Sequence, residues 1–288
     1  MACRVSAMAV SSGFRRSRLG DYVVHVALLA TCALIVVPIY WIVSTSLKPN
    51  DEILVTPTTL LPQHPTIDHF KVALTGDFRS YLLNSLIAAG GATTLGILLA
   101  VPAAFGFAKY AYRGSGALLA FAVVTRVFPP IALALPFFLQ FRAIGLVDTP
   151  WALIVAYLPI VLPLMIWILT GFFRDFPREL IEAAEIDGLG VLGTLTRIVI
   201  PLSLPGLGVA TLFGFLVAWN EFVIALTLTR TPAGQTMPVG ISTLITQFQV
   251  LWGEMMAVAT IYLLPVLVVT VITQRGLVSG LMSGAAKE

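Results

Sequence analysis

Residues 174–204, RDFPRELIEAAEIDGLGVLGTLTRIVIPLSL, form a polar interval between two long apolar runs. The interval holds five of the 14 acidic residues of the chain, together with Arg174, Arg178 and Arg197. So many charges are unfavourable in the hydrocarbon core of a bilayer, so this interval must face water or a protein partner. Most of the chain on either side of it is apolar enough to lie in a membrane.

The composition of the whole chain is typical of a membrane protein that crosses the bilayer several times. Hydrophobic residues make up 58% of the 288 residues and charged residues 11%, whereas soluble domains carry about 25% charged residues. The mean hydropathy is +0.95. We therefore predict an all-α, polytopic membrane protein. Nothing in the sequence supports nucleic-acid binding, and two cysteines are too few for a disulfide framework or a cysteine metal site.

Six apolar runs predict six transmembrane helices, at residues 22–46, 82–107, 116–141, 150–173, 205–229 and 252–274. The chain then divides into an N-terminal arm at 1–21, a six-span domain at 22–274 and a tail at 275–288. Eleven Lys or Arg residues fall in the arm, the 109–113 turn, the polar interval and the tail, and five fall in the three opposite loops. By the positive-inside rule, the interval and both termini are expected to be cytoplasmic.

Two of the apolar runs carry small residues in steps of four, which places them along one side of a helix. Such seams let membrane helices approach closely, so they predict helix packing rather than a binding site. The first seam consists of Ala88, Ala92, Gly96, Ala100, Ala104 and Ala108, and the second of Gly206, Ala210, Gly214 and Ala218.

The external loop at 47–80 contains His64, Asp68 and His69. Their spacing in a proline-rich loop favours a solvated surface over a metal site. We therefore predict no metal site in this chain.

The polar interval predicts one short helix from Pro177 to Asp187. Proline can open a helix because its missing N–H would be unpaired there, and Gly188 suits the left-handed conformation that ends one. Glu179, Glu182 and Ile186 fall on one stripe of this helix. A helix of about 16 Å is poorly stable alone, so it is expected to lie in a groove of a partner.

The same interval resembles the EAA motif of ABC importer permeases. Glu182-Ala183-Ala184 is followed after three residues by Gly188, and after nine more by Ile198-x-Ile200-Pro201, with Ile200 in place of the usual Leu. Further segments resemble the shorter permease subunit of maltose-type carbohydrate importers: 46–49 (SLKP), 84–85 (NS), 128–129 (FP), 145–146 (GL), 219–221 (WNE) and 280–287 (GLMSGAAK). The resemblance covers nearly the whole chain.

The resemblance implies a six-span permease subunit of an ATP-driven carbohydrate importer in a bacterial or archaeal inner membrane. Its expected partners are a second permease, two ATPase subunits, an extracytoplasmic solute-binding protein and membrane lipid. Two sets of ATPase-contacting residues are implied. The coupling loop at 174–204 supplies Glu179, Glu182, Ala183, Ala184, Asp187, Gly188 and Pro201, with Glu182 pairing with an arginine of the ATPase, and the tail supplies Gly280, Ser283, Gly284 and Lys287.

The chain itself is expected to be no enzyme and to bind no cofactor. A nucleotide-binding P-loop requires lysine after glycine. None of the four lysines follows a glycine, so ATP is expected to be bound by the partner subunits.

Two charged residues, Arg126 and Glu221, fall inside predicted transmembrane helices, where lone charges are costly. They could neutralise each other across the third and fifth spans. Alternatively, Arg126, Asn220 and Glu221 could line the sugar path, with Trp219 either stacking on a sugar ring or packing. The sequence leaves these interpretations open, and it does not indicate which carbohydrate is carried.

Two other classes of function compete with an ATP-driven importer. Buried Arg and Glu are suggestive of an ion-driven secondary transporter, but that class does not explain the EAA motif. A non-transporting membrane scaffold would leave uptake unaffected when the gene is lost.

Overall fold

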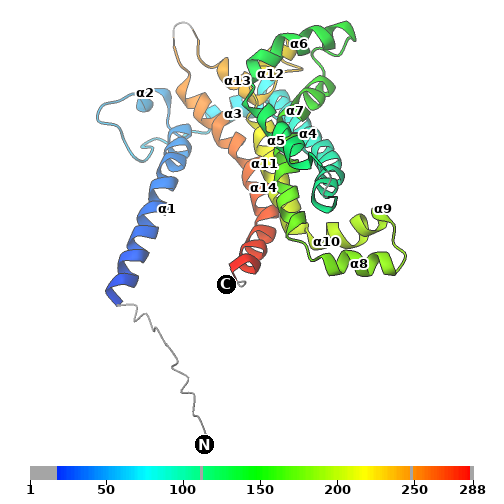
Figure 1. The fold of residues 1–288 in the computed structure, drawn as a ribbon. Helices are drawn as coiled ribbons and strands as arrows, with labels where there is room; N and C mark the ends of the chain where they lie inside the picture. Colours follow the sequence, from blue (N-terminus) through cyan, green and yellow to red (C-terminus); the bar gives the residue numbers. More distant parts are fainter. Residues whose placement is uncertain (1–17, 111–112, 247–248, 286–288) are drawn as a thin grey trace, which may run out of the picture.

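The computed structural model describes residues 18–110, 113–246 and 249–285. The regular structure in these ranges is helical, and the one strand-like pairing within them is a bridge between Ile245 and Val250. Among the described residues, four continuous helices are long and apolar enough to cross a membrane. They are α1 (Arg18–Ser46), α4 (Asp77–Lys109), α7 (Pro150–Arg174) and α14 (Trp252–Ala285) (Figure 1). The predicted all-α membrane fold is therefore confirmed.

Two bent helix pairs bring the number of candidate spans to as many as six. In the first pair, α5 (Ser115–Val124) and the 3₁₀ turn η1 (Thr125–Val127) meet α6 (Pro130–Ala143) at 90°. In the second, α9 (Val191–Thr194), the π-helical η2 (Leu195–Val199) and α10 (Ile200–Leu202) meet α11 (Leu204–Trp219) at 82°. The first bend falls at Phe128 and Pro129, where proline removes a backbone donor.

The predicted span at 205–229 is wrong in one respect, because the helix ends at Trp219 and α12 (Val223–Leu228) is separate. Both carboxylate oxygens of Glu221 accept hydrogen bonds from the N–H of Ile224 at 3.0 Å, and one also accepts from Ala225 at 3.1 Å. A side chain that satisfies the first N–H groups of a new helix stabilises the break before it. The span predicted at 252–274 agrees with the candidate membrane span in α14, and the helix itself continues to Ala285.

The core lies around α7, which packs against both α4 and α11. The two small-residue seams are buried at these contacts, as predicted for helix packing; Ala108, at the end of the first seam, is half-buried. Gly206 packs against the ring of Phe172, and Gly96 and Gly214 both pack against Met165. The seams therefore bring α4, α7 and α11 into close contact.

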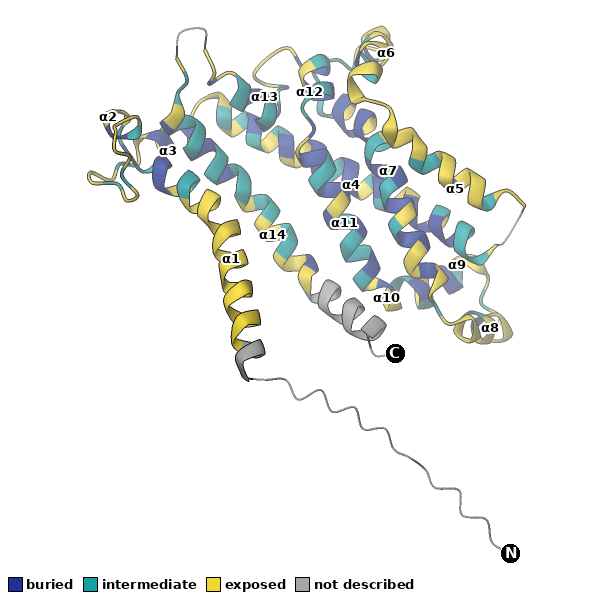
Figure 2. Cartoon of the chain, turned by 60° about the vertical axis from the view of Figure 1, so that its left-hand side comes forward, coloured by how far each residue is buried: buried dark blue, intermediate teal, exposed yellow. Residues whose placement is uncertain are grey.

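α1 stands apart from this bundle and contacts α14 (Figure 2). Its residues 22–40 are all exposed, although most of them are apolar. This surface must lie against lipid or another protein in the membrane.

The short helices gather at the two ends of the bundle (Figure 1). α2 (Asn50–Ile53), α3 (Asp68–Leu74), α13 (Met237–Ser242), α6 and α12 lie at one end, and α8 (Arg178–Ile186) lies with α9 and α10 at the other. The polar interval and the loop at 47–80 are thus on opposite ends of the bundle.

The loop after α1 is more ordered than its composition suggests. The ammonium group of Lys48 donates to the carbonyl of Thr59, and Glu52 accepts from the hydroxyl of Thr59 and the N–H of Gln63. Burial opposes ionisation of Glu52, but its hydrogen bonds outweigh this effect and hold its pKa below the usual value.

His64 is exposed in this loop, as predicted. The prediction of a solvated surface is wrong for His69, which is buried, with its Nε2 3.0 Å from the carbonyl oxygen of Lys48. Its ring also packs against Gly253 at the start of α14, so it serves to join the loop to the bundle.

At the same end, Asp148 holds the segment that follows α12. Its carboxylate accepts hydrogen bonds from the N–H of Arg230 at 2.9 Å and from the N–H and hydroxyl of Thr231 at 3.2 and 2.7 Å. Asp148 has φ +68°, a left-handed conformation that is rare outside glycine. Burial raises the pKa of Asp148, but the hydrogen bonds from Arg230 and Thr231 outweigh burial and lower it.

Residues Asn84 and Ser85 of α4 hold the other end of this segment. The amide of Asn84 donates to the carbonyls of Ala233 and Gln235 at 2.7 and 2.9 Å, and the Ser85 hydroxyl accepts from the N–H of Met237 at 2.7 Å. The segment between α12 and α13 is therefore fixed at both ends.

Candidate functional site

The short helix predicted from the polar interval is present as α8. Pro177 is extended, with ψ 123°, and the helix runs from Arg178 to Ile186. Gly188 has φ +80°, and the N–H groups of Gly188 and Leu189 donate to the carbonyls of Glu185 and Ala184. These bonds satisfy carbonyls that the helix end leaves unpaired, and glycine makes the left-handed turn at little cost.

Most side chains of α8 are exposed. Ala184 is buried, whereas Glu179, Glu182 and Ile186, the three residues of the predicted stripe, are exposed. Neither Glu179 nor Glu182 makes an ion pair or side-chain hydrogen bond with the described part of the chain. Ala183, Asp187, Gly188 and Pro201 are exposed as well, so the predicted coupling residues other than Ala184 form an open surface.

A cavity of about 540 Å³ lies between α8 and the ends of α4 and α7. Both aromatic and charged side chains line it. Lys109, the last residue of α4, makes an ion pair with Glu185 of α8 across this region. The lining includes Phe105, Lys109, Phe173, Arg174, Phe176, Arg178, Ile181, Glu182, Glu185 and Val199.

The contact between Lys109 and Glu185 was not predicted from the sequence. The charge pattern placed Lys109 in a turn on the same side of the membrane as the polar interval. Since the chain has few charges and these lie on the same side, the sequence could have suggested that Lys109 pairs with an acid of the interval.

The two charges inside the predicted spans do not pair in the structure. Arg126 lies exposed in η1, whereas Glu221 is buried and binds the first turn of α12. The ion pairs among the described residues are Asp68–Lys71 and Lys109–Glu185. The geometry therefore does not favour the interpretation that Arg126 and Glu221 neutralise each other.

Trp219 and Asn220 occupy different environments. The Trp219 side chain is buried between the rings of Phe215 and Tyr262, at centroid distances of 5.3 and 4.8 Å. Tyr262 also donates to the carbonyl of Trp219 at 2.5 Å. Asn220 is exposed and its amide donates to the carbonyl of Leu216. Trp219 thus packs inside the bundle, whereas the side chain of Asn220 is exposed.

The predicted contacts of the tail are only partly within the described chain. Gly280, Ser283 and Gly284 belong to the last turns of α14, and Lys287 lies outside the described residues. These turns lie at the same end of the bundle as α8 (Figure 1).

Several known proteins with similar sequences are named as permeases of sugar transport systems. The trehalose transport system permease protein SugB of Mycobacterium tuberculosis is 38% identical over 253 residues, which is 87% of this chain and 92% of that protein. The sulfoquinovosyl glycerol transport system permease protein SmoH of Agrobacterium fabrum is 36% identical, over 87% of this chain and 88% of its own length. The trehalose/maltose transport system permease protein MalG of Thermococcus litoralis is 33% identical, over 87% and 91%.

Solved structures share the fold at lower sequence identity. A chain of a bacterial ABC transporter that imports the acidic polysaccharide alginate superposes with a TM-score of 0.75 and 22% identity. The match covers 91% of this chain and 97% of that one. The family described as "Binding-protein-dependent transport system inner membrane component" matches residues 92–282, which include all of α8. The chain belongs to this family of transport system inner membrane components.

Proposed function

We propose that the chain is the membrane-spanning permease subunit of an ATP-driven importer of a carbohydrate. Its proposed partners are a second permease, two ATPase subunits and an extracytoplasmic solute-binding protein. As a family member the chain is a non-catalytic transport subunit. The proposed coupling to ATPase subunits is supported by α8, a short exposed helix. Its Glu182 has no charged partner within the described chain.

The carbohydrate substrate is inferred from the solutes for which several relatives are named. Proteins named for trehalose, maltose, sulfoquinovosyl glycerol and diacetylchitobiose transport each match more than 85% of the chain. These solutes share many hydroxyl groups and differ in size and charge. The proposal therefore commits to the class of solute and not to one sugar.

The proposed mechanism is alternating access driven by motion of α8. An arginine of an ATPase subunit pairs with Glu182, and closure of the ATPases on ATP displaces α8. From α8 the chain runs through α9, η2 and α10 into α11, with a bend of 82° before α11. The bends before α11 and before α6 are places where helices can change angle without unfolding, so the path opens alternately to each side. No cofactor is bound by this chain, since ATP is held by the partners.

The orientation is part of this proposal. We place the arm at 1–21, α8 and the tail from 275 in the cytoplasm of a bacterial or archaeal cell, with the loop at 47–80 outside. The opposite positions of α8 and this loop support it, as does the distribution of Lys and Arg (Figure 1). A topology reporter fused at Gly188 should be active inside the cell and one at His64 outside. An external report from Gly188 would contradict the orientation.

For the solute path, we propose that Arg126 and Asn220 supply the polar contacts. Both side chains are exposed next to breaks in membrane helices, where backbone groups are freed as well. Trp219 and Glu221 support the path indirectly, by packing and by holding the start of α12. Altered sugar preference in Asn220→Ala, with normal assembly, would support this role.

Uptake of ¹⁴C-labelled trehalose, maltose and diacetylchitobiose by cells with and without the gene tests the main proposal. Loss of uptake of one sugar on deletion, restored by the wild-type gene, is the expected result. Uptake that persists when ATP is depleted but the ion gradient is intact would favour a secondary transporter. If no sugar depends on the gene, the importer proposal fails.

A further inference from the structure

Few contacts hold α8 to the rest of the protein. Ala184 is its buried residue and half-buried Ile181 packs against the core, while the cavity of about 540 Å³ lies between the rest of the helix and the ends of α4 and α7. Segments with few buried contacts open at low free energy. If α8 is to move together with the bundle, a further contact must hold it there.

Lys109 provides such a constraint from the end of α4. A cation is favoured at this position because the C-terminal end of a helix carries partial negative charge. The Lys109 side chain is only 16% exposed, and its ammonium group lies 5.7 Å from the ring centroid of Phe105 and 5.6 Å from that of Tyr110. Rings and burial thus fix the ammonium group that binds the Glu185 carboxylate.

The roles of Glu185 and Glu182 are therefore different. Glu182 precedes Glu185 by about one turn of α8 and has no charged partner among the described residues. Glu185 is paired with α4 and remains 52% exposed. One carboxylate of α8 is left for another subunit, and the other binds α8 to its own bundle.

The receiving helix, α4, is well placed to pass a displacement on. Its seam residues Ala88, Ala92 and Ala100 are fully buried against the bundle, and Gly96 packs against Met165 of α7. Close-packed helices of this kind shift as units because their interface cannot deform gradually. Movement of α8 can thereby reach α4 and α7 directly, as well as α11 through the chain.

We propose that Lys109 and Glu185 form a positioning pair that fixes α8 against α4 and transmits the displacement of α8 to α4 and α7. This inference rests on the proposed function, in which α8 is moved by an ATPase. The pair takes no part in ATP hydrolysis. Its loss lowers the amount of solute moved per ATP hydrolysed, while the subunits still assemble.

A double-mutant cycle in the purified complex, reconstituted into lipid vesicles, tests the proposal. Lys109→Met and Glu185→Gln keep the side-chain size and remove the charges. Each should lower the sugar moved per ATP hydrolysed about fivefold, and the double variant should lower it no further, because one interaction is lost in all three. Unchanged single variants, or losses that multiply in the double variant, would overturn the proposal. Lys109→Arg should keep most of the coupling.

A second readout needs neither sugar nor ATP. Nitroxide labels at Leu180 in α8 and Leu99 in α4, two exposed positions outside the predicted stripe of α8, report the distance between these helices in the complex after Cys3 and Cys32 are replaced by Ala. Both single variants should broaden the distance distribution equally. An unchanged distribution would contradict the positioning role. If the wild-type complex transports no sugar, the proposed function fails, and this measurement still tests the pair.

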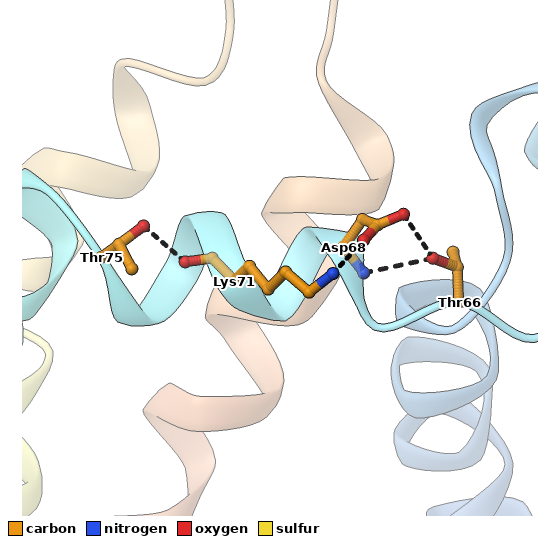
Figure 3. A network of polar contacts seen from close by, with 4 residues as sticks. All are labelled: Thr66, Asp68, Lys71 and Thr75. Atoms are coloured by element: carbon orange, nitrogen blue, oxygen red, sulfur yellow. Dashed lines mark hydrogen bonds and ion pairs between the residues drawn. The ribbon is translucent and has the colours of Figure 1, made fainter.

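The ion pair Asp68–Lys71 in α3 gives a matched control (Figure 3). Its side chains are 72% and 66% exposed, and the carboxylate also accepts from the hydroxyl of Thr66. Exposed pairs contribute little energy. Asp68→Asn and Lys71→Met should leave both readouts at the wild-type level, so an equal effect there would overturn the special role of Lys109 and Glu185.

Discussion

Met165 of α7 occupies the space that a side chain at Gly214 of α11 would need. A Cβ atom on Gly214 would lie 1.8 Å from the terminal methyl of Met165 and 3.2 Å from its sulfur. The same sulfur would lie 2.8 Å from a Cβ atom on Gly96 of α4. One methionine therefore contacts both small-residue seams, at the place where three helices meet.

Gly214→Ala should destabilise the protein by about 1–3 kcal/mol, because Met165 must move out of a well-packed position. Thermal unfolding in detergent, followed by circular dichroism, measures the change. Gly90→Ala in α4 is the control, since a Cβ atom there meets nothing within 4 Å. Adding Met165→Ala should recover part of the loss specific to Gly214→Ala. Equal stability of the two glycine variants would show that the contact is not limiting.

Glu182→Lys should abolish sugar uptake and weaken co-purification of the ATPase, because it places a cation where an arginine of the partner is proposed to bind. Removal of one member of such a pair costs about 2–5 kcal/mol. Cell uptake and pull-down from membranes measure these effects, and the sugar affinity of the binding protein should not change. Normal uptake by this variant would contradict the assignment of α8 as the coupling helix.

Asp148→Ala should destabilise the segment between α12 and α13 by about 2 kcal/mol, because three hydrogen bonds to a carboxylate are lost. The resulting opening can be measured by hydrogen exchange at the N–H groups of Arg230 and Thr231. Exchange at Met237, whose N–H is bound by Ser85, should change less.

The stabilisation by Asp148 should also depend on pH. Its folded pKa lies below the usual 3.8, so the unfolded state binds the proton more readily. The contribution is complete above about pH 5 and is lost as the pH falls through 3.8 toward the folded pKa. Wild type should therefore lose more stability than Asp148→Asn on acidification. A parallel loss in both proteins would place the acid sensitivity elsewhere.

Glu221→Ala should cost about 1–3 kcal/mol, because the buried N–H groups of Ile224 and Ala225 lose their acceptor. Arg126→Gln should change stability by less than about 0.5 kcal/mol, since its exposed side chain has no ion pair in the described chain. Unfolding of both variants and of the double variant measures this. A large coupling between the two positions would revive the interpretation that they pair.

Local signals in the sequence located α8 well. Pro177 and Gly188 mark its ends because proline and glycine act through their own backbones, and the structure differs by one residue at each end. The seams were equally predictable, since small residues in steps of four have few other uses in a membrane helix. The family resemblance then pointed to the same helix.

Contacts between distant segments could not be predicted in this way. The break after Trp219 depends on Glu221 turning back to the N–H groups of α12, and the apolar pattern continues unchanged across it. The burial of His69 depends on Gly253, which is far away in the sequence. The pairing of Lys109 with Glu185 needs the folded positions of α4 and α8.

Because α1 is exposed over most of its length, substitutions in this helix can report what lies beside it. Within this chain, substitution of the apolar residues between 22 and 39 removes few contacts, because they are exposed along the whole stretch. Lipid tails accept any large apolar side chain, whereas a neighbouring helix accepts only shapes that fit. Each of these residues can be replaced by tryptophan in turn, and subunit assembly can be measured in native membranes. The pattern of effects would then show which side of α1 contacts another protein. Positions that tolerate tryptophan would face lipid, and positions that do not would mark a protein neighbour.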